Sequence, residues 1–194
     1  GALNWINKFE LLKNNKNKLL TEVLNNKNSY WYEFKPTAFA DLVTSISPDE
    51  RIFVAKLTSP TAVNQRLVSF SLINQTEDID LHHALLNSLL GIFFLEALGF
   101  GRGLGVLDLN STKLKDNMRI LDPSLLTEQN KNKIKEFFKP ILAREVYPLS
   151  KELTMDDRDK FETAVLEAYS LLEIKDKLKN SLLKMYQIRK AVDY

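Results

Sequence analysis

The sequence of 194 residues contains no cysteine, and its only histidines are the neighbours His82 and His83. The lack of cysteine excludes disulfides and thiolate metal sites, and it favours a reducing, cytoplasmic location. Neighbouring side chains on a helix diverge by about 100°, so one metal ion cannot easily bind both imidazoles. We therefore expect no metal site, with one imidazole facing the core and the other facing solvent.

An excess of charge of one sign is also missing. Lys and Arg number 27 against 25 Asp and Glu, which gives a formal net charge of +2 and a pI near 8.6. This balance is too weak by itself to indicate a nucleic-acid partner, so only the distribution of the charges can do so. The hydrophobic share of 44% is typical of a globular protein. No basic-then-apolar leader opens the chain, and we interpret the start at Gly1 as a trimmed or excised N-terminus.

One hydrophobic run, "LHHALLNSLLGIFFLEALGF" from Leu81 to Phe100, is about as long as a membrane span. It is interrupted by five polar side chains that are costly inside a bilayer: His82, His83, Asn87, Ser88 and Glu96. We therefore predict a buried core helix from about residue 80 to 98 and no membrane partner. Ser88 within such a helix is expected to bond to the preceding backbone turn.

The region before this run is predicted to form short helices and then a small sheet. Residues 1–28 are rich in lysine and asparagine with broken helical periodicity, which indicates one or two short helices with a polar outer face. Short β-prone runs follow, namely "YWYEF", "RIFVAKL" and "RLVSFSL". The stretches "KPTAFADLVTSISPDE" and "TSPTAVNQ" between them carry prolines, serines and an asparagine, so we expect irregular connections there.

The region after the run is predicted to be mainly helical. "VLDL" indicates one more short strand, and the sequence beyond Pro123 reads as helices, the last of them amphipathic from Ile174 to Val192. The predicted fold class is α+β: a small mixed sheet with a buried helix, followed by a C-terminal helical bundle. We place a mixed α/β body at residues 1–123 and the helical bundle at residues 124–194.

Four of the six glycines alternate in "GFGRGLG", Gly99 to Gly105, with Arg102 at the centre. A dinucleotide fingerprint needs Gly-x-Gly-x-x-Gly after a strand and before a helix, and here both the spacing and the order of elements differ. The stretch therefore predicts a helix stop, with Gly99 at a left-handed cap, and a mobile loop that presents Arg102. Arg102 is either a solubilising surface charge or a contact to a phosphate or a guanine edge.

Three polar residues, Asn64, Gln65 and Arg66, stand together near the start of a predicted strand. Asn and Gln can read adenine and Arg can read guanine, so the triplet is a candidate base-reading cluster, although polar triplets at strand starts are common. Lys56 is a further DNA-binding candidate. The aromatic run "SYWYEF" favours core packing, with base stacking as the alternative. Lysines 131, 133, 135 and 139, and then 175, 177 and 179, are expected to line solvated helix faces and could add unspecific attraction to phosphates.

Residues 30–123 resemble a known family. The signals are "LLNS" from Leu85 to Ser88, the glycine-rich loop, and the "LDL…K…ILDP" passage from Leu107 to Pro123. These are similar to the target-recognition portion that follows the catalytic domain in adenine-specific DNA methyltransferases of bacterial restriction-modification systems. The resemblance implies that Asn64 to Arg66 and the loop around Arg102 face double-stranded DNA, and that the parent enzyme flips an adenine out of the duplex.

The catalytic features of that family are missing from this sequence. There are no adjacent prolines, as the family's Asn/Asp-Pro-Pro-Tyr/Phe motif would require, and no strand is followed by a glycine turn for S-adenosylmethionine. We therefore expect a non-catalytic module without a cofactor, whose methyl donor and catalytic residues belong to an upstream methyltransferase domain of the parent chain. Two alternatives stay open. One is a protein-interaction module of a restriction complex that docks through Ile174 to Val192. The other is a metal-dependent nuclease built on Asp49, Glu173 and Lys175.

Overall fold

The computed structural model describes residues 1–24, 30, 32, 39–74 and 76–191, and the chain divides into two compact units, residues 1–37 and 38–194. The first unit contains α1 (Ala2–Glu10) and α2 (Leu20–Leu24), which confirms the short helices predicted there. The Asn14 side chain accepts hydrogen bonds from the amides of Lys16 and Lys18 and so closes the turn between the helices. The "YWYEF" strand prediction falls outside the described residues, except for Tyr30 and Tyr32, whose rings stack at 5.3 Å.

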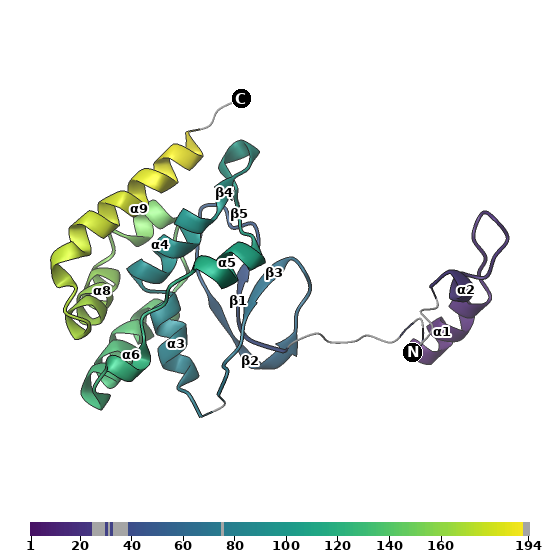
Figure 1. Ribbon diagram of the computed structural model, residues 1–194, viewed down its shortest axis with the longest axis horizontal. Coiled ribbons are helices and arrows are strands. Elements are labelled where there is room, and N and C mark those ends of the chain that lie inside the picture. The colour runs from purple at the N-terminus through teal and green to yellow at the C-terminus, as the bar shows by residue number, and fades with distance from the viewer. Residues whose placement is uncertain (25–29, 31, 33–38, 75, 192–194) are drawn as a thin grey trace. The chain divides into compact units, whose positions relative to one another are not determined.

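The second unit is built on a three-stranded antiparallel sheet of order β2-β1-β3 (Figure 1). Its strands are β1 (Phe39–Ser45), β2 (Ala55–Ala62) and β3 (Leu67–Phe70). The β3 prediction is confirmed. The prediction that "FADLVTS" is an irregular connection was wrong, because this segment is the central strand. Asp41 interrupts the alternation of apolar and polar residues that indicates a strand. It lies where the pairing with β2 is irregular, and its carboxylate accepts the amide hydrogen of Leu72 at 2.9 Å.

Strand β2 also differs from its prediction in both boundaries. It begins at Ala55 rather than Arg51 and continues through Pro60 into the stretch expected to be a connection. A proline is tolerated here because β2 is an edge strand and Pro60 lies in its irregularly paired part, between the paired residues Lys56 and Thr61. Just before β2, the backbone of Val54 bonds to the side chain of Asn87 rather than to a neighbouring strand. The Val54 amide donates to Asn87 Oδ1 at 2.9 Å, and the Val54 carbonyl accepts from Asn87 Nδ2 at 2.8 Å.

The predicted single helix from residue 80 to 98 is two helices, α3 (Ile79–Leu86) and α4 (Leu89–Leu98), bent by 60° at Asn87 and Ser88. Ser88 caps α4 and also donates to the Leu85 carbonyl at 2.7 Å, as expected for a serine in this run. Both helices are largely buried, which confirms the core prediction. Among the described residues, no helix taken singly has the length and apolarity to cross a membrane, although α3 and α4 pass that test as a bent pair.

Polar contacts from a distant helix fix the bend. Arg158 and Glu162 lie on α8 (Asp156–Ala168) and are almost fully buried. Arg158 Nη2 donates to the Asn87 carbonyl at 2.5 Å, and Glu162 Oε2 accepts from the Leu89 amide at 2.7 Å. The backbone groups freed by the helix break are thereby satisfied, as buried polar groups must be. Burial raises the pKa of Glu162, while Arg158 counteracts the shift with an ion pair at 2.7 Å.

Four α-helices of the described chain follow Pro123, where helices were predicted. They are α6 (Glu128–Leu142), the short α7 (Leu149–Glu152), α8 and α9 (Lys175–Lys190). Helix α6 packs against α8 and α3, and α9 packs against α4, so helices from both sides of residue 123 lie in the same compact unit (Figure 1). Between the two groups lie the hairpin of β4 (Phe100–Gly101) and β5 (Leu107–Asp108), and then α5 (Ser111–Asn117). The α+β class is confirmed.

Candidate nucleic-acid interface

The Asn64 to Arg66 triplet lies in the exposed turn that leads from β2 to β3. Asn64 Oδ1 accepts the amide hydrogen of Arg66 at 2.8 Å, and the Asn64 carbonyl accepts that of Leu67 at 3.1 Å. Asn64 thus stabilises the turn with the same oxygen that adenine reading would use. Gln65 and Arg66 are exposed, and neither side chain has a hydrogen bond or ion pair in the described part of the chain. These two are the better candidates for contact with a partner.

A series of backbone contacts brings this turn close to the glycine-rich hairpin. The Arg66 carbonyl accepts the Ile46 amide at 3.0 Å, and the Ile46 carbonyl accepts the Leu109 amide at 2.7 Å. Two successive pairings of this kind span about 10 Å at the usual strand spacing. The turn at Gln65 and Arg66 therefore lies beside the end of β5 and the start of α5, segments more than 40 residues away in the sequence.

Arg102 lies in the same hairpin and is ion-paired. Its Nη2 lies 2.5 Å from Asp108 Oδ2; the Arg102 side chain is 61% exposed, and that of Asp108 only 10%. Asp108 also lies 3.5 Å from the hydroxyl of Ser47. The buried carboxylate restrains an exposed guanidinium, so several donors of Arg102 stay accessible. The sequence-based expectation of an exposed Arg102 is confirmed, but its side chain is held rather than free.

The glycines of the hairpin act differently from their prediction. Gly99 is extended, with φ −73° and ψ 172°, so the left-handed cap predicted there was wrong. A Cβ at Gly99 would lie 2.5 Å from Leu107 Cδ1, so close packing against β5 is the reason for this glycine. The left-handed positions are Leu104, with φ 64°, and Gly105, with φ +69°. The Gly105 carbonyl accepts a hydrogen bond from Arg189 Nη1 of α9, so the hairpin is docked onto a helix and is not the mobile loop that we expected.

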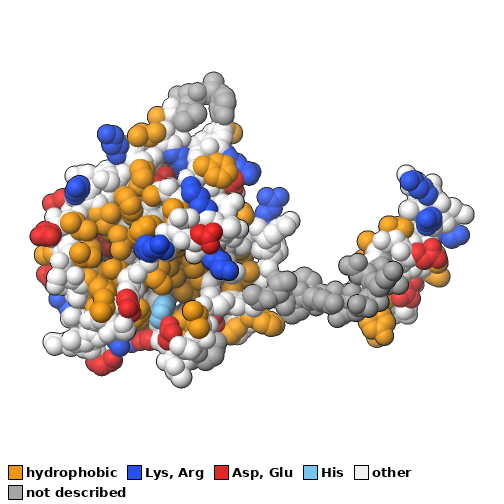
Figure 2. Space-filling view, in the orientation of Figure 1, with side chains coloured by type: hydrophobic (Ala, Val, Ile, Leu, Met, Phe, Trp, Pro, Cys, Tyr) orange, Lys and Arg blue, Asp and Glu red, His pale blue; other side chains and the backbone are white. Residues whose placement is uncertain are grey.

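Helix α5 and the residues just after it contribute cations that the sequence reasoning missed. Lys113, Lys115 and Arg119 are exposed, and within the described ranges none of them has a carboxylate at ion-pair distance. Arg119 Nη1 reaches only backbone carbonyls, those of Asp116 at 3.5 Å and Met118 at 3.4 Å. Asp116 is the one acidic residue on α5. Figure 2 shows Lys and Arg side chains around a hydrophobic area on the face of the second unit that carries α5.

The lysines emphasised by the sequence are mostly neutralised by ion pairs. Those of α6 each have a carboxylate partner: Lys131 with Glu128, Lys133 with Glu167, Lys135 with Asp78 and Lys139 with Glu136. The hydrogen bond to Asp78 raises the pKa of Lys135. In the second lysine group, Lys175 pairs with Asp159 at 2.6 Å, and Lys177 and Lys179 have no ion pair among the described residues. Paired lysines have little attraction left for phosphates, so α5 is the stronger candidate.

Lys56 is placed apart from these residues. It lies on β2, opposite Leu42 of β1, whereas β3 pairs with the other edge of β1. Its ammonium group is ion-paired with Asp80 at the start of α3. Lys56 is therefore at the far edge of the sheet from Arg66, and its charge is compensated. We define the candidate interface as Gln65, Arg66, Arg102, Lys113, Lys115 and Arg119.

The geometry favours neither the metal-dependent nuclease nor the protein-interaction module. Asp49 accepts a hydrogen bond from Lys190 at the end of α9, while Lys175 begins the same helix. At 1.5 Å per residue the helix places Lys175 roughly 22 Å from Lys190, so Asp49 and Lys175 do not meet around one metal ion. The described residues contain no group of three or more acidic or histidine side chains that could hold a metal ion. The apolar face of α9 packs on α4 through Leu178, Leu182 and Tyr186, so the exposed Ile188 stands singly and does not form an apolar stripe for docking.

One histidine faces the core as expected, but the side chain of the other, His82, is only 15% exposed. His83 is 5% exposed and its Nε2 lies 2.8 Å from the Val54 carbonyl, while His82 lies near the surface with its Nε2 3.1 Å from Glu77. Burial lowers the pKa of His83 and keeps the ring neutral. With Nε2 as the hydrogen-bond donor, His83 has a structural role in holding the segment before β2.

None of the protein-family models, curated proteins and solved structures compared with this chain matches it. The resemblance to the target-recognition portion of adenine-specific DNA methyltransferases therefore stays a prediction.

Proposed function

We propose that this chain is a non-catalytic DNA-binding module, of the target-recognition kind found beside the catalytic domain of adenine-specific DNA methyltransferases. The observation that supports it most is the grouping of exposed cations without carboxylate partners at the β2–β3 turn and on α5, next to Arg102. Cations that are not already paired release counterions from DNA when they bind phosphates. The free energy of this counterion release supplies much of the affinity for duplexes.

The proposal assigns separate roles to the interface residues. Lys113 and Lys115 of α5 and Arg119, two residues past its end, contact phosphates, because they are long, exposed cations close together in the chain. Gln65 and Arg66 reach base edges, since Gln can read adenine and Arg can read guanine in the major groove. The methyl donor, S-adenosylmethionine, and the catalytic residues belong to an upstream methyltransferase domain of the parent protein, so this module carries specificity rather than chemistry.

A charge-reversal comparison tests the proposal. The affinity of the 194-residue chain for a fluorescein-labelled duplex is measured by anisotropy at low salt and at several salt concentrations. The variant Lys113→Glu/Lys115→Glu should weaken binding at least tenfold and reduce the slope of log K against log salt by about 2. The matched control is Lys133→Glu/Lys139→Glu, which changes the same net charge on the ion-paired lysines of α6.

The two variants separate local contact from net charge. If the control weakens binding as much as the α5 variant does, the effect comes from net charge and the interface assignment is wrong. If the unaltered chain binds no duplex at low salt, the proposal of DNA binding fails as a whole.

A further inference from the structure

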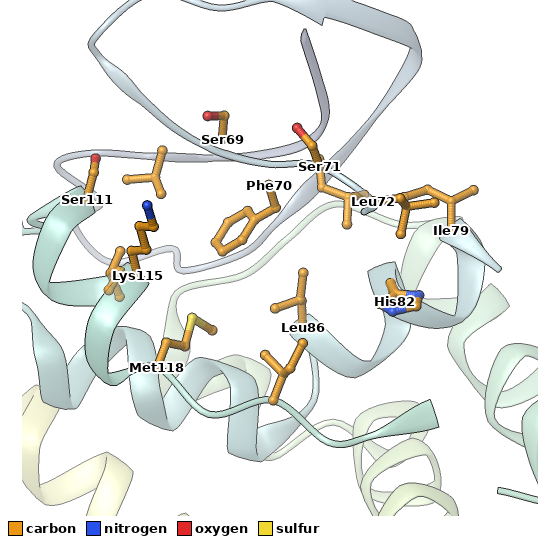
Figure 3. Close-up of a pocket in the computed structure, with 14 residues that line it drawn as sticks. Ser69, Phe70, Ser71, Leu72, Ile79, His82, Leu86, Ser111, Lys115 and Met118 are labelled. Carbon is orange, nitrogen blue, oxygen red and sulfur yellow. The ribbon is translucent and has the colours of Figure 1, made fainter. Parts of the chain in front are cut away.

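A cavity of about 430 Å³ opens between β3, α3 and α5, beside the candidate interface (Figure 3). Its walls are mainly apolar and include Phe70, Leu72, Ile79, Leu86, Leu114 and Met118. Figure 3 shows the Phe70 ring pointing into the cavity from β3, with Lys115 of α5 and Met118, just after that helix, across from it. The volume falls in the range of pockets that bind small molecules. The core therefore leaves a wall of apolar side chains, including an aromatic ring, open on this face.

The polar groups at the edge of the cavity differ in what they can offer. Ser71 is committed, because its hydroxyl donates to the Phe39 carbonyl at 2.6 Å. His82 is engaged with Glu77 and with the Asp78 carbonyl. Ser69, Ser111 and Lys115 are exposed and have no side-chain partner among the described residues. Two hydroxyls and one ammonium group thus remain available for the edge of a ligand and for an anionic group attached to it.

Charge complementarity determines the class of occupant. Lys115 lies at the edge of the cavity. Two further cations are close in sequence to residues that line it: Lys113 directly precedes Leu114, and Arg66 comes two residues before Val68. An apolar protein side chain would use the walls but would have no need of these cations. A nucleobase on a phosphate backbone uses both, because bases stack on aromatic side chains while lysines and arginines hold the strand.

We propose that this cavity binds a single unpaired nucleobase of the bound strand, with the base against Phe70 and Met118 and its flanking phosphates near Lys113 and Lys115. This inference rests on the proposed DNA binding and adds a preference: the module binds a duplex that contains one unpaired base more tightly than a fully paired duplex.

Three labelled duplexes of the same sequence test this preference with the full chain. One is fully paired, one carries a single extra adenine in one strand, and one carries an abasic residue at that position. The extra adenine should raise the affinity about tenfold over the paired duplex, the free energy of one base stacked on an aromatic side chain. The abasic duplex has the same backbone distortion but no base, so it should bind like the paired one.

A variant that fills the cavity gives the second measurement. Ser111→Trp places a large ring at the edge of the cavity from an exposed position, and Thr112→Trp adds the same ring at the next exposed position, outside the cavity. The ratio of the affinities for the extra-adenine and paired duplexes should fall to about 1 in Ser111→Trp and stay near tenfold in Thr112→Trp. Comparing ratios removes any general effect of the new ring on DNA binding.

The outcomes distinguish this inference from the proposed function. If paired DNA binds well but the abasic duplex binds as tightly as the extra-adenine one, the preference is for bent DNA and the cavity assignment is overturned. An unchanged ratio in Ser111→Trp overturns it too. If free indole, but not adenosine, protects the cavity amides in NMR titrations, the occupant is an apolar protein side chain instead. Loss of all DNA binding by the unaltered chain overturns both proposals.

Discussion

The exposed guanidinium of Arg102 is held 2.5 Å from the carboxylate of Asp108, a residue of β5 whose side chain is almost fully buried. Ion pairs with one exposed partner contribute only about 0–1 kcal/mol to stability. The pairing therefore serves to orient Arg102 rather than to hold the fold together. Because the carboxylate comes from the adjacent strand, the direction of the arginine is set by the hairpin itself.

Replacing Arg102 tests whether this orientation serves binding. Arg102→Ala should weaken duplex binding about tenfold relative to the unaltered chain, which is the value of one charged hydrogen bond. The slope of log K against log salt should fall by about 1. The melting temperature should change little. The measurement is fluorescence anisotropy across a salt series, with circular dichroism to check folding. Unchanged binding would mean that Arg102 is only a solubilising surface charge.

The buried ion pair between Glu96 and Arg189 should matter far more for stability. Arg189 Nε lies 2.8 Å from Glu96 Oε1, and the two side chains are 4% and 2% exposed, respectively. Glu96→Gln removes the charge but keeps the shape, which leaves an uncompensated guanidinium in the core at a cost of about 3–5 kcal/mol. Urea denaturation measures the loss. Lys190→Gln, at a more exposed pair with Asp49, is the control and should cost less than about 1 kcal/mol.

The same substitution should loosen the glycine-rich hairpin. Arg189 also donates to the Gly105 carbonyl, so its displacement frees the loop from α9. Amide hydrogen exchange at residues 102–106 should be faster in Glu96→Gln than in Lys190→Gln. Equal exchange in both variants would show that the hairpin does not depend on Arg189 for its docking.

Gly91 should not tolerate a side chain. A Cβ at this position would lie 2.3 Å from the Leu86 carbonyl oxygen and 2.9 Å from that of Leu85, both backbone atoms at the end of α3. Gly91→Ala should therefore force α3 and α4 apart and lower the free energy of unfolding by about 2–3 kcal/mol. Gly101→Ala is the control, because its Cβ would meet only Arg189 Cγ at an ordinary 3.6 Å. A similar stability for both variants would contradict the tight packing at the helix bend.

His83 should make the protein less stable as the pH falls below neutrality. Burial lowers the pKa of His83, with Lys56 adding to the shift and the Val54 carbonyl and Asp80 opposing it. The unfolded chain binds a proton below its ordinary pKa of about 6.5, whereas the folded protein does not until the pH is lower. Stability contributed by neutral His83 is therefore present above that pH and declines below it, by at most about 1.4 kcal/mol per pH unit.

Paired substitutions isolate this contribution. His83→Gln should flatten the pH dependence of the free energy of unfolding between about pH 7 and 5, because no imidazole remains to titrate at this position. Its stability at neutral pH should also fall, since the hydrogen bond to Val54 is altered. His82→Gln, one residue away, is the matched control that also removes one imidazole. Urea denaturation at a series of pH values measures both; equal slopes in the two variants would refute the assignment to His83.

Some of the fold could be predicted because the signals are local. The apolar run from Leu81 to Phe100 is buried as its composition predicts, and the helices beyond Pro123 form where periodicity places them. Strand β1 was missed because Asp41 and the irregular pairing beside it break the alternation that indicates a strand. The bend between α3 and α4 was missed because the groups that satisfy it come from Val54, Arg158 and Glu162, far away in sequence.

The sequence by itself determined the α+β class, the buried apolar helices and the exposure of Gln65, Arg66 and Arg102, because hydrophobic period and turn chemistry act over a few residues. Only the tertiary structure decided which cations are neutralised and which stay unpaired. Lys135 forms an ion pair with Asp78, and Lys133 forms one with Glu167, each with a residue far away in the sequence. Lys113 and Lys115 have no ion pair with a carboxylate in the described part of the chain. Electrostatic pairing depends on distance in space, so the candidate interface emerges only once the chain is folded.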